Sequence, residues 1–319
     1  VVVADNCTDR TAERARSAGA ECYERMDEVR RGKPYALDWM VRQLPLERYD
    51  AVVIVDADTV IDSVFLRAMD RHVRRGERAI QGYFGVLNPE DTWLTRLGVV
   101  PAALKFRLQF PGKQTLGLSC PLAGNGMCFA AGLMREKGWN AFSLTENWEY
   151  YILLTLDDVA TTVAPEAKIY SQVARSLAQG ETQRVRWAKG RMETLAKYWR
   201  RLLVSGLLKP SPSRLDALVE LARPSHAILL LSSVVVFGFS AALYVAEGTS
   251  GPAWLSGLAV AGQVVLLAAA MVVARVPWRS WVALALVPYY LAWKVIVSLK
   301  AVLGRRQKQW QRTDRHEVR

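Results

Sequence analysis

Two acidic residues follow directly after a short apolar run in the segment DAVVIVDADTV, residues 50–60. An uncharged, mostly β-branched run of this length is typical of a strand buried on both faces of a parallel sheet. Asp56 and Asp58 would then lie at the carboxyl end of that strand, where open α/β sheets bind ligands, and both would face the same way. A hard divalent cation on phosphate oxygens fits such a pair. A role in capping the next helix is the alternative, although Asp62 is better placed for it.

Two loops carry residues that can approach a ligand. The segment LAGNGMCF, residues 122–129, contains Gly124, Asn125 and Gly126 before another strand-like run. Glycine allows the backbone to come close to a ligand, and a tight turn explains these glycines equally well. Upstream, the basic loop RRGK ends at Lys33, where it can meet a nucleotide.

A helix predicted for SLTENWEYYILL, residues 143–154, begins with acidic residues. Glu146 and Glu149 share one side of its first turn by their i, i+3 spacing. This arrangement suits base catalysis, but carboxylates at the amino end of a helix also stabilise its dipole.

The helix predicted for ETQRVRWAKGRMETL, residues 181–195, gathers four residues that suit a sugar nucleotide: Gln183, Arg184, Arg186 and Trp187. Arg186 can grip a pyrophosphate, and Trp187 can present an aromatic face to a sugar. A solvated basic face is the common alternative for such a charge pattern.

The elements that must position these residues alternate between strand and helix. Strand-like runs at residues 1–5, 51–55 and 78–84 alternate with helical patterns that begin near Thr8, Lys33 and Asp62. This alternation predicts an α/β domain with a mostly parallel, Rossmann-like sheet. Residues 92–118 mix apolar and basic residues, with breaks expected at Pro101 and Pro111, and either pack beneath the domain or lie on a membrane.

The rest of the chain has the composition of a membrane region. Residues 227–246 and 252–274 carry no charge, and each is long enough to cross a bilayer core of about 30 Å as a helix. The apolar segment 281–303 contains two lysines and four aromatic residues, which suit the membrane surface at least as well as its centre. We therefore predict two spans, followed by an interfacial or third membrane helix.

The distribution of basic residues predicts the orientation. The loop EGTSG between the two spans has none, whereas residues 305–319 contain six. Two crossings return the chain to the cytoplasm, so we predict an integral protein of the inner or plasma membrane with a cytoplasmic catalytic domain. The net charge of +12 fits a surface that faces anionic lipid and a phosphate-rich substrate. No close run of Lys and Arg alternates with aromatic residues in the soluble part, so we expect no nucleic-acid partner.

These patterns divide the chain into a cytoplasmic domain at 1–205, a linker or interfacial segment at 206–225, a membrane region at 226–304 and a basic cytoplasmic tail at 305–319. The first residues, VVVADN, are strand-like and lack an initiator Met. They predict a chain that starts inside a domain, after a first strand and after any upstream membrane segment. The four cysteines have no CxxC spacing and are expected to be reduced thiols.

No single motif is decisive, but their order is specific. Asp5 in ADNCTD, Lys33 in RGKPYAL, DAD, GNGM, TEN and QRVRW resemble, in this order, the motifs of membrane-bound family-2 glycosyltransferases of the cellulose-synthase-like and hyaluronan-synthase-like branch. The resemblance covers about residues 1–200, and the apolar remainder matches the architecture of that branch. Gln183, Arg186 and Trp187 meet its QxxRW motif in full.

The resemblance implies a GT-A fold and a metal-assisted transfer with inversion at the anomeric carbon. The donor would be a nucleotide-diphosphate sugar, usually UDP-linked, that supplies a hexosyl or N-acetylhexosaminyl group to a polysaccharide or lipid-linked acceptor. By the same resemblance, Asp5 and Lys33 would contact the nucleobase side of the donor, and Asp56 would lie near the ribose and diphosphate. Asp58, with Asp56, would hold Mg²⁺ or Mn²⁺ on the diphosphate.

The remaining motif residues would bind substrate. Asn125, with Gly124 and Gly126 beside it, would lie in the acceptor pocket. The diphosphate and acceptor site would be lined by residues of the last motif, namely Gln183, Arg184, Arg186 and Trp187. Arg186 and the metal would neutralise the charge that develops on the leaving diphosphate.

The chain departs from the family at the catalytic base. Where the family has Thr-Glu-Asp, residues 145–147 are Thr-Glu-Asn, and Asn147 cannot accept a proton at neutral pH. We predict that Glu146 acts as the base while Asn147 orients the acceptor. Glu149, one turn further on, is the alternative base, and an impaired enzyme is the third interpretation.

Two other functions compete with this one. A sugar nucleotidyltransferase also uses acidic pairs, but it needs neither QxxRW nor membrane spans, and the sequence has no Gly-rich nucleotidyl-transfer loop. A non-catalytic membrane sensor or scaffold for sugar nucleotides is the second alternative, because loss of one catalytic group can remove most of the rate. A channel for polymer export would need upstream helices or a second copy of the chain, which leaves a homo-oligomer open.

Overall fold

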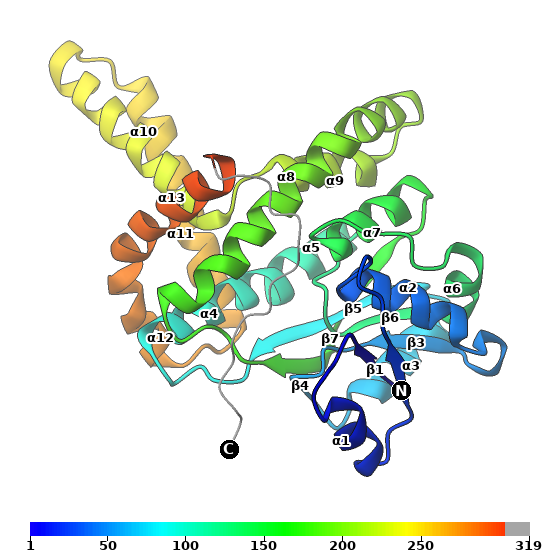
Figure 1. Cartoon of the computed structure of the whole chain (residues 1–319). Helices are drawn as coiled ribbons and strands as arrows, with labels where there is room; N and C mark the ends of the chain where they lie inside the picture. The colour runs from blue at the N-terminus through cyan, green and yellow to red at the C-terminus, as the bar shows by residue number, and fades with distance from the viewer. Residues whose placement is uncertain (304–319) are drawn as a thin grey trace.

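The computed structural model describes residues 1–303, so the basic tail predicted at 305–319 lies outside the described residues. Its centre is a five-stranded sheet with the order β3-β6-β5-β7-β4 (Figure 1). The strands are β3 (Ala51–Ile54), β4 (Thr59–Ile61), β5 (Ala79–Val86), β6 (Met127–Ala130) and β7 (Thr161–Ser171). A separate two-stranded parallel sheet joins β1 (Val2–Asp5) to β2 (Cys22–Arg25).

The predicted α/β class is confirmed, but the sheet is mixed rather than mostly parallel. Within the five-stranded sheet only β5 and β7 run parallel, whereas β6 runs antiparallel to both β3 and β5, and β4 runs antiparallel to β7. A buried strand has the same apolar composition whether its neighbours run parallel or antiparallel to it. The run AVVIV therefore predicted the position of the strand but not the direction of its neighbours.

Helices cover both faces of the sheet because its strands alternate apolar side chains between them. In β6, Met127 and Phe129 join the larger core with α7 (Glu146–Leu156), while Cys128 joins a second cluster under α3 (Phe65–Arg74). The larger cluster also takes in residues of α2 (Lys33–Gln43) and α6 (Ala131–Lys137). The short helix α1 (Thr11–Ser17) packs on the two-stranded sheet.

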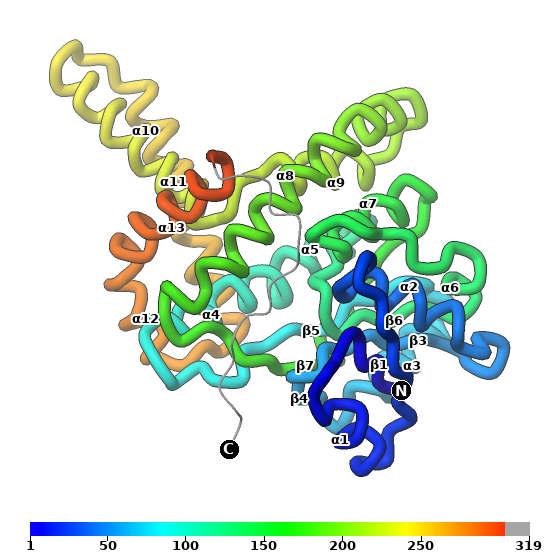
Figure 2. The backbone as a smooth tube through the Cα atoms, viewed as in Figure 1, coloured from blue at the N-terminus to red at the C-terminus, as the bar shows by residue number. Residues whose placement is uncertain are grey.

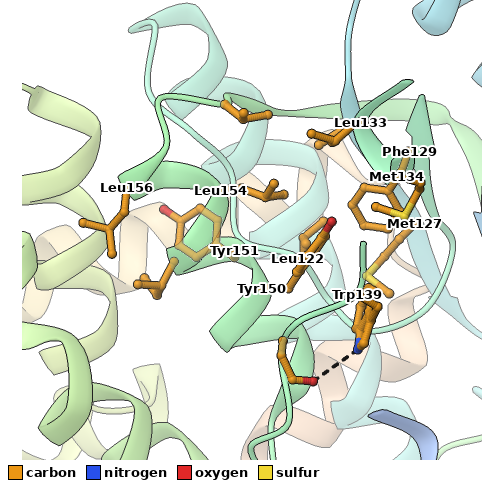
Figure 3. Packing of buried hydrophobic residues seen from close by; sticks show 14 of the residues in the cluster. Leu122, Met127, Phe129, Leu133, Met134, Trp139, Tyr150, Tyr151, Leu154 and Leu156 are labelled. Atoms are coloured by element: carbon orange, nitrogen blue, oxygen red, sulfur yellow. Dashed lines mark hydrogen bonds between the residues drawn. The ribbon is translucent and has the colours of Figure 1, made fainter. Parts of the chain in front are cut away.

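Aromatic stacking forms the middle of the larger core (Figure 3). The rings of Trp139 and Tyr150 are stacked with centroids 4.5 Å apart, and both meet Phe129 edge-on. The indole nitrogen of Trp139 donates a hydrogen bond to the carbonyl of Ala141 at 3.2 Å, which satisfies its polar group inside the core. This packing holds the amino end of α7 beside β6.

The segment at 92–118 is helical and joins the sheet domain to the apolar helices. It forms α4 (Trp93–Ala103), a π-helical stretch (Leu104–Gln109) and α5 (Phe110–Thr115). Neither expected proline break occurs, because Pro101 lies inside α4 and the chain continues through a π-helix, while Pro111 stands in the first turn of α5, where its missing N–H is tolerated. Val100 and Ala103 pack against Met271 and Val276, so this segment lies against the apolar helices.

Six helices complete the described chain: α8 (Leu177–Leu208), α9 (Pro212–Ala222), α10 (His226–Glu247), α11 (Gly251–Val273), α12 (Trp278–Ala283) and α13 (Val287–Leu303). Within residues 1–303, three helical segments are long and apolar enough to cross a membrane: His226–Glu247, Gly251–Val273 and Trp278–Leu303. The connected ends of α10 and α11 project away from the sheet domain, as Figure 2 shows, whereas the other end of α11 packs against α4. These two helices lie where the uncharged segments of the sequence predicted spans.

A pair of leucines tests the assignment of the core. Leu133 in α6 is fully buried, whereas Leu66 in α3 is 62 % exposed. We expect Leu133→Ala to lower the free energy of unfolding by about 2–5 kcal/mol, because it removes apolar contacts and leaves a cavity. Leu66→Ala should change it by less than about 0.5 kcal/mol. Denaturant unfolding of the purified protein in detergent measures both, and equal effects would contradict this core.

Candidate active site

Lys33, at the amino end of α2, links three other segments of the chain. Its Nζ donates hydrogen bonds to Asp56 Oδ1 and to the Gly124 carbonyl, both at 2.5 Å, and lies 3.8 Å from Glu146 Oε1. The structure thus brings together the end of β3, the glycine loop and the amino end of α7. The Asp56 side chain is 38 % exposed, which keeps this cluster open to a ligand.

Asn125 fixes the loop after β3, which carries Asp56 and Asp58, through side-chain hydrogen bonds. Its Oδ1 accepts a hydrogen bond from the backbone N–H of Asp56 at 3.1 Å, and its Nδ2 donates to Thr59 Oγ1 at 2.7 Å and to Ser171 Oγ at 3.3 Å. The side chain is 3 % exposed. Asn125 therefore fixes the loop after β3, and its side-chain amide is occupied by protein partners.

The turn that carries Asn125 requires glycine at one position for a steric reason. Gly126 has φ +63°, and a Cβ there would come within 2.7 Å of Ile169 Cδ1. Gln81 in β5 supports the same turn, since its Nε2 donates to the Asn125 carbonyl at 2.9 Å and its Oε1 accepts from the Ala123 N–H at 2.7 Å. Sequence reasoning missed Gln81, although one glutamine in an otherwise apolar strand was a signal.

The structure separates the two glutamates of α7. Glu146 lies with Lys33, whereas the Glu149 carboxylate turns into the protein and accepts four hydrogen bonds, from Phe142 N, Ser143 N, Lys197 Nζ and Tyr198 OH, at 2.7–2.8 Å. Asn147 donates from Nδ2 to the Leu122 carbonyl at 2.6 Å and so ties α7 to the glycine loop. Glu146 is the glutamate of this helix that joins the cluster.

The electrostatics of Glu146 differ from those of Glu149. Burial raises the pKa of Glu146 above its ordinary value of 4.5, and the charge of Lys33 opposes this rise without cancelling it. Burial alone would also raise the pKa of Glu149, but hydrogen bonds from Lys197, Tyr198 and Ser143 outweigh it and lower that pKa. A carboxylate with a raised pKa is suited to accept a proton, whereas one with a lowered pKa is suited to hold structure together.

Helix α8 brings the last motif to the cluster. Its amino end is capped by Ser176, whose Oγ accepts from the Gln179 N–H at 3.2 Å. Burial lowers the pKa of Arg186, and the nearby charges of Glu146 and Asp56 oppose that shift. Arg186 is therefore within electrostatic reach of two acids of the cluster.

The other three residues of the last motif have different surroundings. Gln183 is half-buried, and Trp187 is 48 % exposed beside Arg186. Arg184 lies against α13, where its Nη1 donates to Tyr290 OH at 2.9 Å. The structure therefore does not bring Arg184 to the substrate site that the sequence predicted for it.

Asp5 ties the two-stranded sheet to the loop before Lys33. Its Oδ1 accepts from Arg25 Nη1 at 2.6 Å, and its Oδ2 accepts from the Gly32 N–H at 3.2 Å. Arg25 is buried and also donates to Asp27 at 2.8 Å. Asp5 and Arg25 are direct partners in the β1–β2 register, a pairing that the sequence did not reveal.

Asp56 and Asp58 suit a metal ion whose other ligands are substrate phosphates and water. Over residues 1–303 no group of three or more His, Cys, Asp or Glu side chains is arranged to hold a metal ion. Mg²⁺ is commonly bound by one or two carboxylates together with substrate phosphates and water, rather than by a cage of protein ligands. Asp58 is exposed and lies two residues after Asp56, so the two carboxylates would hold a cation that arrives with a diphosphate.

Comparison with known proteins places this site in a family. The family model described as "Glycosyltransferase like family 2" matches residues 1–190, which include every residue of the cluster and the last motif. No curated protein matches the chain.

Glu149 offers a test of the separation between the two glutamates. Glu149→Gln removes the ion pair with Lys197, and we expect it to lower the free energy of unfolding by about 1–3 kcal/mol at pH 7. The lowered pKa means that this stabilisation is complete above pH 4.5 and disappears as the pH falls through the pKa of Glu149. The difference from wild type in thermal unfolding should therefore shrink on acidification.

The exposed Glu28 provides the matched control, since Glu28→Gln should leave unfolding unchanged. Should Glu149→Gln retain full stability, the structural role assigned to Glu149 would be wrong.

Proposed function

Because the chain belongs to the glycosyltransferase-like family 2, we propose that it transfers a sugar from a nucleotide-diphosphate donor to a saccharide or lipid-linked acceptor at a membrane, with inversion at the anomeric carbon. The observation that carries this proposal is the cluster in which Lys33 contacts Asp56 and approaches Glu146, with Arg186 near both acids. The cations Lys33 and Arg186 suit a negatively charged leaving group. Of the two acids, Asp56 suits the donor side, and Glu146 suits the removal of a proton from an acceptor hydroxyl.

The donor would bind along the ends of α2 and β3. The loop of Asp5 and Gly32 borders its nucleobase side, and Asp56 follows at the ribose and diphosphate. Lys33 and Arg186 lie close enough to the acids to neutralise negative charge as the diphosphate leaves. Mg²⁺ or Mn²⁺ held by Asp58 and Asp56 would supply further charge stabilisation to the diphosphate.

Glu146 would act as the general base. It accepts the proton of the acceptor hydroxyl, whose oxygen then forms a bond to the anomeric carbon while the bond from that carbon to the diphosphate oxygen breaks. Its burial and raised pKa support this role. Asn147 holds α7 to the glycine loop through Leu122, which keeps Glu146 in register. Since this chain has Asn147 where the family has the aspartate base, the proton would be accepted one residue earlier on α7, at Glu146.

The membrane arrangement follows from the helices after the catalytic domain. We assign α10 and α11 as two spans and α12–α13 as an interfacial element, with the catalytic domain on the cytoplasmic side of an inner or plasma membrane. One face of α13 contacts charged residues of α8, among them Glu181 and Arg184, and such groups are expensive in hydrocarbon. The other face exposes apolar side chains to lipid, including Ile296, Leu299 and Val302.

The donor class is the first test of this proposal. Membranes that contain the protein, incubated with UDP-sugars and Mn²⁺, should release UDP, and Asp58→Ala should lower that release at least about 100-fold. Asp70→Ala, at an exposed position on α3, is the matched control and should leave the rate unchanged. Product sizing then distinguishes polymer from single addition. Nucleotide binding without release for any donor would favour the sensor or scaffold instead.

The base is the second test. Glu146→Gln should lower kcat by about 10²–10⁴-fold while the KM for the donor changes little, because the amide cannot accept a proton. Since Glu146 must be ionised to act, the wild-type rate should fall as the pH decreases through its pKa, which lies above 4.5. Glu149→Gln, compared per folded molecule, should keep most of the rate. Near-normal turnover by Glu146→Gln would assign the base elsewhere.

A further inference from the structure

Helix α8 is held on the side opposite the active site by α13. Arg184 Nη1 donates to Tyr290 OH at 2.9 Å, and its guanidinium lies 5.6 Å and 5.5 Å from the ring centroids of Tyr290 and Trp293. Distances below about 6 Å are those of cation–π contacts. We name Arg184, Tyr290 and Trp293 the Arg184 clamp.

The clamp is part of a longer contact between α8 and α13. Lys300 of α13 donates a hydrogen bond to Glu181, one turn before Arg184 on α8. Trp293, Val297 and Ala301 are buried on the face of α13 that the clamp uses, at the i, i+4 spacing of one helical stripe. The two helices therefore meet along several turns through both apolar and charged groups.

The opposite side of α8 packs closely against the start of α7, the helix that begins at Glu146. A Cβ on Gly190 would come within 2.6 Å of Thr145 Cγ2 and 2.8 Å of Thr145 Oγ1, so α8 and the start of α7 approach as closely as glycine permits. Residues two apart on a helix point about 200° from each other, so Arg184 faces α13 while Arg186 lies on the other side of α8, one turn before Gly190. The charges of Glu146 and Asp56 act on Arg186 there. The position of Arg186 thus depends on contacts made on both sides of the helix.

We propose that the Arg184 clamp is a positioning device for catalysis, through which α13 at the membrane surface holds Arg186 at the diphosphate. This inference rests on the proposed function, because it gives Arg184 no contact with substrate and lets it act through Arg186. A planar guanidinium suits the task, since it stacks on two rings and donates to a phenol at once. Release of α13 from α8 would let Arg186 move from the acids, and displacement of a catalytic group by about 1 Å can lower a rate about 100-fold.

A double-mutant cycle tests the clamp. Arg184→Ala should lower kcat about 10–100-fold with little change in the KM for the acceptor. In an Arg186→Ala background the same substitution should have no further effect, because the residue it positions is gone. Tyr290→Phe keeps the ring and loses only the hydrogen bond, so it should lower kcat less than Arg184→Ala. Arg200→Ala, at an exposed position on the same helix, is the matched control and should retain the wild-type rate.

Binding of UDP with Mn²⁺ to the purified protein gives a second measurement that needs no turnover. Arg184→Ala should weaken UDP binding in the presence of Arg186 and should not weaken it further in Arg186→Ala. If Arg184→Ala lowered kcat or UDP binding equally in the wild-type and Arg186→Ala backgrounds, Arg184 would be only a stabilising residue and the inference would be overturned. Unchanged kcat and UDP binding in Arg184→Ala would also overturn it. Wild-type protein that binds UDP without transferring sugar would instead overturn the proposed function, while the binding cycle would still decide the role of the clamp. Absence of UDP binding by wild type would overturn both.

Discussion

The candidate active site depends on one ammonium group that is shared between two acids. Lys33 contacts Asp56 and the Gly124 carbonyl and lies 3.8 Å from Glu146, so it balances two carboxylates that would otherwise repel each other in a partly buried place. The same contacts join α2, the loop after β3, the glycine loop and α7. Under the proposed function, a diphosphate bound beside Lys33 would change this balance and so would couple donor binding to the protonation of Glu146.

Much of this arrangement was predictable from the sequence because it follows the chain locally. An apolar strand ending in Asp56, a glycine turn before β6 and a helix starting at Glu146 are patterns of a few residues each. The uncharged segments also predicted the positions of α10 and α11, since length and absence of charge are properties of composition. The order of these short patterns then led to the family.

What the sequence could not predict were partners supplied from far along the chain. Asn125 matched a substrate-binding motif, yet its amide is used by Asp56, Thr59 and Ser171, the last of them 46 residues away. Glu149 has the spacing of a catalytic partner, but the backbone N–H of Phe142, ahead of α7, and the Lys197 ammonium occupy its carboxylate. Strand direction has the same origin, because pairing between strands depends on tertiary contacts rather than on local composition.

Helix α8 is contacted on two sides, by the sheet domain and by α13. The soluble core fixes the helix at one side, where Gly190 meets Thr145, and α13 fixes it at the other, where Arg184 meets Tyr290 and Trp293. A long helix contacted on one side only can roll or shift, and small shifts matter most for a side chain that must meet a developing charge. Helix α8 is therefore held in place only when the sheet domain and α13 contact it together. Under the proposed function, the site around Arg186 would be complete only with both contacts made.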